Sequence, residues 1–345
     1  MSSRLRSRHA GIRGRAALVM ALAALMTTVS SCSSTNSPGA AGAAGGAKDP
    51  TIAVALIAPV GLLEDNVAAF EAELAKLGYH PHYENYNAQG QISNVSTIVE
   101  QIAQQHPDLV YAVGTPLNVA VMQELPKTPQ VFGVMSDPVG AKLAHSLTQP
   151  GGYATGTSGA VPASLTFDIL TAAIPNLKHV GLIGNLAETN TTSDIAHLSA
   201  EARKRGIEFT VRPVTSTEDV ASAIRSFSGI QALIIPGDNT VVSAIATVAQ
   251  TADAQHIPTF DPYGASLAEQ GITVAFGPDY NVLGTAAAEQ AAKILGGASP
   301  ADIPVVGLGS PGIPNLVYLN SASAAKVDLT VTPALRKLVA KTIGG

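Results

Sequence analysis

The feature of this sequence that most restricts its fold is an alternation of short apolar runs with longer amphipathic segments. The first run, residues 51–57, is almost entirely apolar, as expected for a strand buried on both faces. The next segment, residues 65–77, has apolar residues at helical spacing and stops at Gly78. Strands that alternate with helices in this way form βαβ units. The pattern therefore predicts parallel sheets covered by helices on both faces.

The alternation occurs twice along the chain, with similar spacing in each half. In the first half we expect strands at 51–57, 82–86, 108–113 and 130–135, and helices at 65–77, 92–104 and 116–125. In the second half we expect strands at 179–183, 208–211, 231–235, 258–260 and 273–275, and helices at 164–173, 193–205, 220–227, 241–254 and 280–295. Loops at the carboxyl ends of two such sheets surround one cleft. The predicted fold class is α/β, with two doubly wound parallel-sheet lobes and a ligand cleft between them.

The N-terminus has the pattern of a targeting segment. Arginines precede a short apolar stretch at residues 16–26, and Val29-Ser30-Ser31-Cys32 resembles a bacterial lipobox. This resemblance implies that residues 1–31 are a lipoprotein signal peptide and that Cys32 is acylated; the alternative is an ordinary signal peptide with a chance cysteine. Residues 32–50, rich in Ser, Gly and Ala, are expected to be a flexible tether. We expect lobe one at 51–157 plus about 281–300, and lobe two at 158–280 plus about 301–345.

Composition excludes several classes of protein. Hydrophobic residues make up 46% of the chain, which is too many for a disordered protein, and a single cysteine excludes a disulfide framework and a Cys-rich zinc site. A net charge of −5 argues against a nucleic-acid partner. The segment Gly307–Gly312 matches a dinucleotide-binding pattern, but a strand-like run follows it where a helix is needed. No catalytic motif is present, so we expect a protein that is not an enzyme and has no cofactor or bound metal.

Six short segments go beyond periodicity, in one order along the chain, and four of them follow predicted strands. They are Asn87-Ala88-Gln89-Gly90, Ser136-Asp137-Pro138-Val139, Thr155-Gly156-Thr157-Ser158, Asn185 with Glu188 and Asn190, Pro236-Gly237-Asp238-Asn239, and Ala291 to Gly297 with the following Pro300 to Val305. Together they resemble the ABC-transporter substrate-binding lipoproteins of the tryptophan/tyrosine-binding type, which have the type I periplasmic-binding fold. The resemblance extends from about Thr51 to the C-terminus.

The resemblance implies a lipid-anchored receptor on the outer face of the bacterial cytoplasmic membrane. It would deliver a small solute, in this family often an aromatic amino acid, to an ABC permease. We expect a monomer that meets the membrane only through its lipid. One departure is the segment Val60-Gly61-Leu62-Leu63-Glu64, where the family has His-Pro-x-Leu-Asp. Two alternatives stay open: a stand-alone sensor or chemoreceptor lipoprotein with a ligand such as a purine, and a structural lipoprotein with an empty cleft.

An amino-acid ligand needs donors for its carboxylate, an acid for its ammonium and walls for its side chain. Thr115, at a predicted helix start, is expected to serve the carboxylate together with Ser136 and Ser158. Asp137 and Asp238 are expected near the ammonium, although either could serve only as a helix cap. The other expected contacts are Glu64, Gln89, Asn185, Glu188, Asn190 and Asn239, with Phe276 and Tyr263 as aromatic walls.

Overall fold

The computed structural model describes residues 49–344. The predicted signal peptide, Cys32 and all but the last two residues of the predicted tether lie outside the described residues. Their assignment therefore stays a prediction. No helix among the described residues combines the length and the apolar character that crossing a membrane requires.

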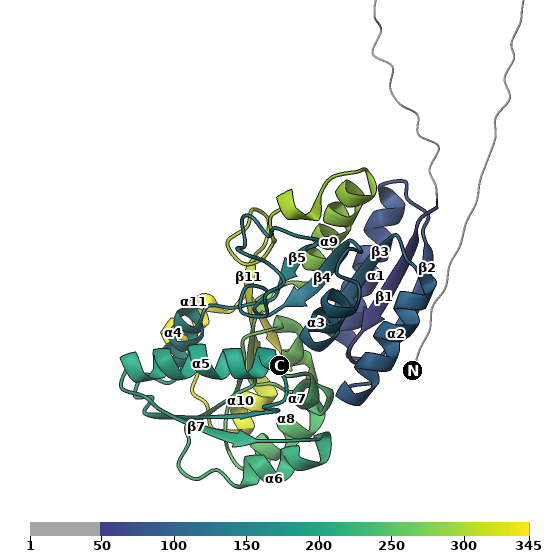
Figure 1. The fold of residues 1–345 in the computed structure, drawn as a ribbon. Coiled ribbons are helices and arrows are strands. Elements are labelled where there is room, and N and C mark those ends of the chain that lie inside the picture. Colours follow the sequence, from purple (N-terminus) through teal and green to yellow (C-terminus); the bar gives the residue numbers. More distant parts are fainter. Residues whose placement is uncertain (1–48, 345) are drawn as a thin grey trace, which may run out of the picture. The chain divides into compact units, whose positions relative to one another are not determined.

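Two sheets organise the described residues (Figure 1). The first has five parallel strands in the order β2-β1-β3-β4-β5. Its strands are β1 (Thr51–Leu56), β2 (His82–Asn87), β3 (Leu109–Val113), β4 (Gln130–Met135) and β5 (Ala154–Ser158). The helices on it are α1 (Gly61–Lys76), α2 (Val95–Gln105), α3 (Thr115–Glu124) and α9 (Tyr280–Leu295), with 3-10 turns η1 (Ile92–Asn94) and η4 (Pro300–Asp302). We call this part lobe one.

The second sheet repeats the same strand order and adds two strands at one edge. Its order is β12-β11-β10-β9-β8-β6-β7, parallel except between β10 and β11. Its strands are β6 (His179–Gly184), β7 (Glu208–Pro213), β8 (Ala232–Ile234), β9 (Thr259–Asp261), β10 (Val274–Pro278), β11 (Asn315–Asn320) and β12 (Lys341–Ile343). Its helices are α4 (Ala163–Ala173), α5 (Thr189–Lys204), α6 (Val220–Arg225), α7 (Asn239–Ser243), α8 (Ile245–Ala254), α10 (Ser321–Lys326) and α11 (Pro333–Leu338), with η2 (Thr217–Asp219) and η3 (Ala265–Gln270). We call this part lobe two.

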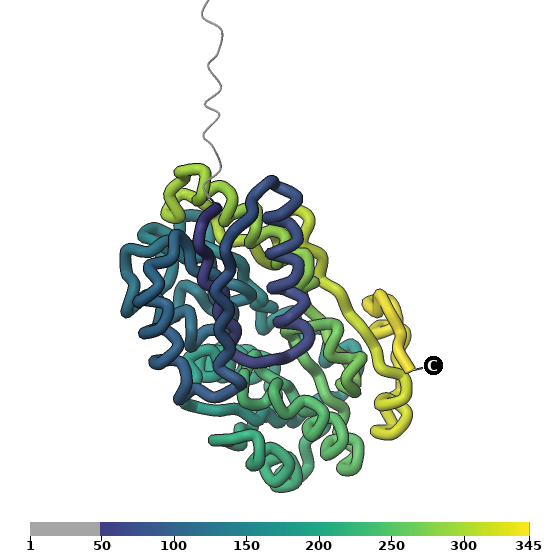
Figure 2. The backbone as a smooth tube through the Cα atoms, turned by 90° about the vertical axis from the view of Figure 1, so that its right-hand side faces the viewer, coloured from purple at the N-terminus to yellow at the C-terminus, as the bar shows by residue number. Residues whose placement is uncertain are grey.

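The chain passes between the lobes three times: from β5 to α4, from β10 to α9, and from η4 to β11, which Figure 2 allows the reader to follow. At the crossing, the Ser158 N–H donates to the Val306 carbonyl at 2.7 Å. Thr157 and Val306 also form an isolated parallel bridge. Two of the crossing segments therefore run side by side.

Burial explains why the predicted strands are apolar on both faces. Every residue of β3 and β4 is buried, and α1 packs against α9 while α2 packs against α3. Helices α1 and α9 approach each other closely at Gly284 of α9, where an added Cβ would lie 2.2 Å from the Asn66 carbonyl oxygen of α1. One buried apolar cluster is continuous across both lobes, since it includes Leu62 and Leu63 of α1 together with Leu267 of lobe two.

The predicted α/β class with two doubly wound lobes is confirmed, and the differences lie in details. The predicted helix at 241–254 is two helices, α7 and α8, with Ala244 between them. The helix predicted from 193 begins at Thr189. The prediction missed its first turn because that turn is polar and carries no apolar periodicity. Strand β5, the edge strand beside β4, was not among the predicted strands.

Candidate functional site

A small cavity lies where the two lobes meet, at the carboxyl ends of strands from both sheets. Its volume is ≈ 50 Å³, and we call it the inner cavity. Lobe one lines it with Leu62, Leu63, Gly114, Thr115, Val134 and Ser136. Lobe two lines it with Gly237, Asp238, Asn239, Val242, Tyr263 and Leu267, and Tyr280 of α9 completes it. The location is the one at which doubly wound sheets bind ligands.

The lobe-one wall is formed by the starts of α1 and α3. Gly114 precedes α3 with φ of 110°, and a Cβ there would lie 2.4 Å from Cγ2 of Ile57. Only glycine therefore allows α3 to begin so close to β1. No side chain caps α3, and Thr115 at its first position is 4% exposed. The wall thus presents the positive end of a helix together with a hydroxyl group.

On the lobe-two wall, the buried carboxylate of Glu188 joins two loops. Its Oε2 accepts hydrogen bonds from the Asn239 N–H at 3.1 Å and from Nδ2 of Asn239 at 2.5 Å. Its Oε1 accepts from the Thr240 N–H at 3.2 Å and from the Thr240 hydroxyl at 3.0 Å. Nδ2 of Asn190 donates both to Glu188 and to the Gly237 carbonyl. Glu188 and Asn190 therefore hold the 237–240 loop in place.

Asp238 lines the cavity with its side chain turned into lobe two. Its Oδ1 caps α7 by accepting the Val241 N–H at 2.8 Å. Its Oδ2 accepts from the Asn185 N–H at 2.5 Å and from the Thr191 hydroxyl at 2.6 Å. Both oxygens are thus engaged and the side chain has no exposed surface, so Asp238 caps the helix; the predicted contact with an ammonium stays a prediction. Burial and the nearby Glu188 raise the pKa of Asp238 well above its ordinary value.

Two further acids lie behind the same wall, and the sequence reasoning missed both. Burial raises the pKa of Asp194 to about 7, although hydrogen bonds from the Tyr263 hydroxyl and the Gly237 N–H oppose this. Burial also raises the pKa of Asp261 to about 7, and its Oδ2 is buried without a hydrogen-bond partner among the described residues. Asp261 ends β9, so the rule that selects residues at strand ends would have found it. Asp194 carries no such signal, since it lies within α5.

The aromatic walls are Tyr263 and Tyr280. Tyr263 was predicted, whereas Tyr280 was not, although it is the first residue of α9. Phe276 is fully buried in the apolar core of lobe two and lines neither of the cavities described here. The prediction of Phe276 as an aromatic wall is therefore corrected: its side chain packs among the buried apolar residues of lobe two.

The remaining predicted residues fall into four places. Ser136 lines the inner cavity, and a Cβ at Gly237 would lie 2.9 Å from its Oγ, so the two lobes touch here. Glu64 and Gln89 are exposed and do not line the inner cavity. Asn185 lies under the wall, where its Nδ2 donates to the Thr240 hydroxyl at 3.1 Å. Asp137 and Ser158 line a second, larger cavity.

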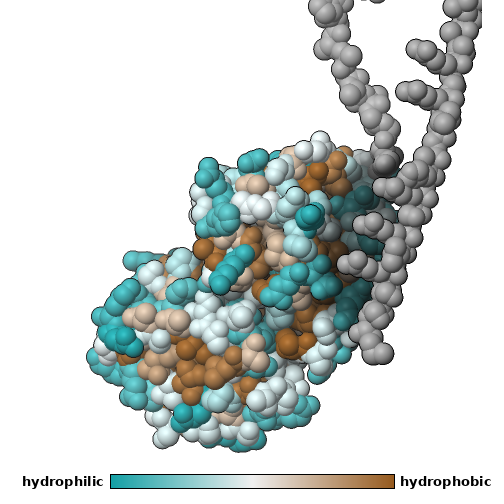
Figure 3. Space-filling model, viewed as in Figure 1, coloured by the Kyte–Doolittle hydropathy of each residue, from teal (hydrophilic) through white to brown (hydrophobic). Residues whose placement is uncertain are grey.

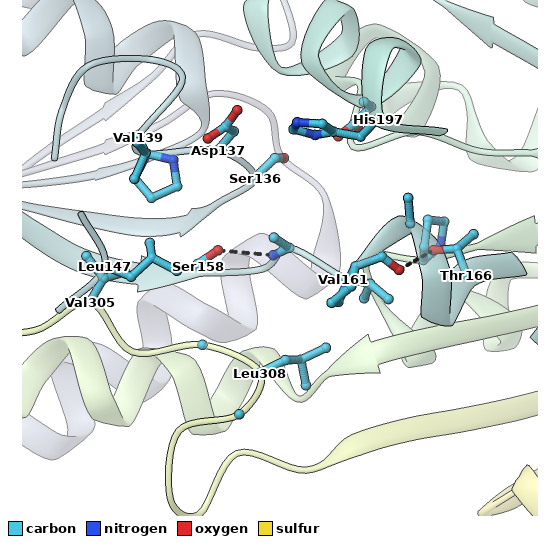
Figure 4. Close-up of a pocket in the computed structure, with 18 of the residues that line it drawn as sticks. Ser136, Asp137, Val139, Leu147, Ser158, Val161, Thr166, His197, Val305 and Leu308 are labelled. Atoms are coloured by element: carbon cyan, nitrogen blue, oxygen red, sulfur yellow. Dashed lines mark hydrogen bonds between the residues drawn. The ribbon is translucent and has the colours of Figure 1, made fainter. Parts of the chain in front are cut away.

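The second cavity, which we call the outer cavity, has a volume of ≈ 880 Å³. It is bounded by the loop after β4, the crossing segments at 158–163 and 304–311, and one side of α5 (Figure 4). It shares Ser136 and Tyr263 with the inner cavity. Among the described residues, no group of three or more His, Cys, Asp or Glu side chains could hold a metal ion.

Comparison with known proteins identifies the family. The model described as "ABC transporter substrate binding protein" matches residues 51–343. A tyrosine-binding protein from Clostridioides difficile (strain R20291) is 31% identical to this chain over 243 residues, which are 70% of each protein.

Two solved structures show the arrangement of the lobes. An ABC domain in complex with L-Trp from Streptococcus pneumonia is 27% identical, with a TM-score of 0.78 over 85% of this chain and 100% of that chain. The ligand-free, open structure of a substrate-binding protein with adhesive properties from Clostridium difficile is 25% identical, with a TM-score of 0.62 over 85% and 98%. The chain superposes better on the complex, in agreement with the contacts between its lobes. The chain belongs to the ABC transporter substrate-binding proteins, with the type I periplasmic-binding fold, and is a solute-binding protein and not an enzyme.

Proposed function

We propose that this substrate-binding protein carries an aromatic L-amino acid at the inner cavity. At ≈ 50 Å³ this cavity is smaller than the usual ligand cavity of about 300–1,000 Å³, so the lobes must separate to admit the ligand and then close around it. The observation that supports this most directly is the composition of the cavity wall. Five aliphatic side chains and two tyrosines, contributed by both lobes, surround a space between strand ends. Such walls suit a flat apolar ring, because burial of the ring removes apolar surface of ligand and protein from water. The names of the two relatives, a tyrosine-binding protein and an L-Trp complex, agree with this proposal.

The carboxylate of the ligand would lie against the start of α3. This helix has no side-chain cap, and Pro116 in its first turn has no N–H, so no side chain satisfies the remaining N–H groups of that turn. Gly114 and Thr115 at its start line the cavity. The hydroxyls of Thr115 and Ser136 supply two more donors beside them. A carboxylate there is stabilised both by hydrogen bonds and by the helix dipole.

The ammonium would lie toward lobe two, where the charge is negative. None of the residues that line the inner cavity is basic. Asp194, Asp238 and Asp261 are buried behind this wall. Burial raises the pKa of Tyr280, and the charges of Asp261 and Asp194 raise it further. A cation in the cavity would be attracted by these carboxylates and would favour their ionised form. Loss of the charge of Asp238 would therefore weaken the attraction for the ammonium without removing a direct contact. It would also weaken the cap of α7, which Asp238 forms.

Calorimetry with L-Trp, L-Tyr, L-Phe and adenine tests the proposal. We expect an aromatic amino acid to bind and adenine not to bind. Thr115→Val keeps the shape of the side chain and removes its hydroxyl, and should weaken binding of the preferred amino acid by about tenfold, since a hydrogen bond to a charged group contributes about 1.5–3 kcal/mol. Thr171→Val is the matched control, because Thr171 lies on α4 and its hydroxyl donates to the Phe167 carbonyl. Equal effects of the two substitutions, or tighter binding of adenine, would contradict the proposal.

We further propose that the protein is held at the outer face of the cytoplasmic membrane by a lipid on Cys32, works with a membrane permease, and is a monomer. The support is the lipobox-like Val29-Ser30-Ser31-Cys32 after an apolar stretch. Cys32→Ala should move the protein from the membrane fraction to the soluble fraction without changing its affinity for the amino acid. Retention of the Cys32→Ala protein in membranes washed with high salt would exclude the lipid anchor.

A further inference from the structure

The outer cavity is separate from the inner cavity and much larger. Its volume of ≈ 880 Å³ compares with ≈ 50 Å³ for the inner one, and the two share only Ser136 and Tyr263. Figure 4 shows side chains from both lobes and from the crossing segments arranged around an open space. Ligand cavities in proteins typically measure about 300–1,000 Å³, so the outer cavity can accept a small organic molecule of its own.

The walls of the outer cavity are mainly apolar. Val161, Val305 and Leu308 line the cavity, and the more exposed Val139 and Leu147 form its rim. Val139 and Leu147 are 42% and 48% exposed, which places them among the few large apolar side chains that the described surface exposes. Figure 3, drawn from the same side as Figure 1, shows apolar side chains exposed on this face among hydrophilic ones. An apolar molecule in the cavity would cover this surface and remove it from water.

Acidic side chains outnumber basic ones in the outer cavity. Its ionisable lining residues are Asp137, Asp194, His197, Glu201 and Lys204. Lys204 is held by Glu201 at 3.2 Å, so these two charges offset each other. Asp137 and Asp194 have no basic partner among the described residues; Asp137 accepts only from Gly140 and Ser193, and Asp194 from Tyr263 and Gly237. The cavity therefore favours a cation and disfavours a carboxylate.

We propose that the outer cavity is a second binding site, which accepts a primary amine with an apolar or aromatic body and no carboxylate. The body lies between Val161, Leu308 and the rim residues, and the ammonium lies toward Asp137 and Asp194. Because Asp137 belongs to lobe one and Asp194 to lobe two, an occupant touches both lobes and the crossing segments between them. Such an occupant stabilises the arrangement in which the lobes are in contact, and so raises the affinity of the inner cavity for its own ligand.

Titration of the full-length protein with tyramine tests this site, because tyramine has an aromatic body and an ammonium but no carboxylate. The titration is carried out on the protein alone and on the protein saturated with L-Trp. We expect one tyramine to bind in both cases, and to bind more tightly when L-Trp is present. The titration of the protein alone tests the outer cavity whatever ligand the inner cavity carries. A failure of the aromatic amino-acid proposal would therefore not be mistaken for a failure of this one.

Leu147→Lys provides the matching variant. The exposed side chain at 147 tolerates a lysine, and the added cation at the rim should weaken tyramine binding by about tenfold while L-Trp binding stays unchanged. Leu77→Lys is the control, because Leu77 is 45% exposed at the end of α1 and lines neither cavity. The proposal is overturned if tyramine does not bind, if L-Trp displaces it, if Leu147→Lys and Leu77→Lys have equal effects, or if a second L-tyrosine binds as tightly as tyramine.

Discussion

The carboxylate of Asp137 in lobe one accepts a hydrogen bond from the hydroxyl of Ser193 in lobe two, with 2.6 Å between the oxygens. It is the one hydrogen bond between side chains of the two lobes within residues 49–344. The other carboxylate oxygen of Asp137 accepts the Gly140 N–H at 2.7 Å, which orients the side chain toward α5. Asp137, which also lines the outer cavity, therefore links the two lobes, and its predicted contact with a ligand stays a prediction.

Removal of this link should favour separation of the lobes. Ser193→Ala should reduce the stability of the contact by about 1 kcal/mol, and so weaken amino-acid binding by about fivefold. Small-angle scattering of the unliganded protein should show a larger radius of gyration for the variant. Ser199→Ala is the control on the same helix, because the Ser199 hydroxyl donates only to the Ala196 carbonyl. Unchanged scattering and affinity in Ser193→Ala would show that the hydrogen bond does not hold the lobes together.

The buried acids predict an unusual dependence of stability on pH. The pKa values of Asp194 and Asp261 are raised to about 7 in the folded protein, from about 4 in the unfolded chain. Between these values the folded protein binds more protons than the unfolded one, so the free energy of unfolding should fall as pH rises from about 4 to about 7. This contribution is fully present below about pH 4 and is lost as pH rises through about 7.

Asp261→Asn should make that dependence shallower. The asparagine oxygen can still accept the Tyr263 and Gly264 N–H groups, and the unpartnered Oδ2 is replaced by a group that does not ionise. Urea unfolding between pH 5 and pH 8 measures the effect, with Asp65→Asn on the exposed side of α1 as control. The same pH dependence in wild type and Asp261→Asn would show that Asp261 does not titrate in this range.

Tyr280 and Tyr263 should respond differently to loss of their hydroxyls. The Tyr280 hydroxyl forms no hydrogen bond with the described residues, so Tyr280→Phe should leave the unfolding free energy nearly unchanged. If this hydroxyl contacts the amino acid, affinity should fall by about fivefold, equivalent to about 1 kcal/mol. The Tyr263 hydroxyl donates to Asp194, and Tyr263→Phe should therefore lower stability as well. Thermal melting and calorimetry of both variants compare the two effects; equal melting temperatures for both would contradict this assignment.

The substitution of glycine by alanine should have different effects on stability at two helix positions. Gly284→Ala would place a Cβ 2.2 Å from the Asn66 carbonyl oxygen and force α9 away from α1, so we expect a loss of about 1–3 kcal/mol. Gly61→Ala at the start of α1 meets no atom within 4 Å and should be neutral or slightly stabilising. Denaturant unfolding measures both values. Equal stability of the two variants would mean that the helices adjust to the added methyl group without cost.

The sequence predicted most of the secondary structure because buried strands and amphipathic helices leave periodic patterns. The predicted helix at 280–295 coincides with α9, and the predicted strand at 130–135 coincides with β4. The start of α5 at Thr189 and the break at Ala244 were missed, because side-chain hydrogen bonds and tertiary contacts determine them. Thr115 and Ser136 were predicted beside the cleft by their position after strands, and both line the inner cavity.

By itself, the sequence determined the α/β class, the two doubly wound lobes and the family, since periodicity and local motifs are properties of neighbouring residues. Only the tertiary structure decided what each polar side chain does. Asp238 and Phe276 follow the same rules of position as Thr115, yet Asp238 caps a helix inside lobe two and Phe276 packs in its core. Conversely, Asp194 lies within a helix and was found only where distant segments meet. Burial and hydrogen-bond partners depend on contacts between residues far apart in the chain, such as Tyr263 and Asp194, and no local pattern encodes them.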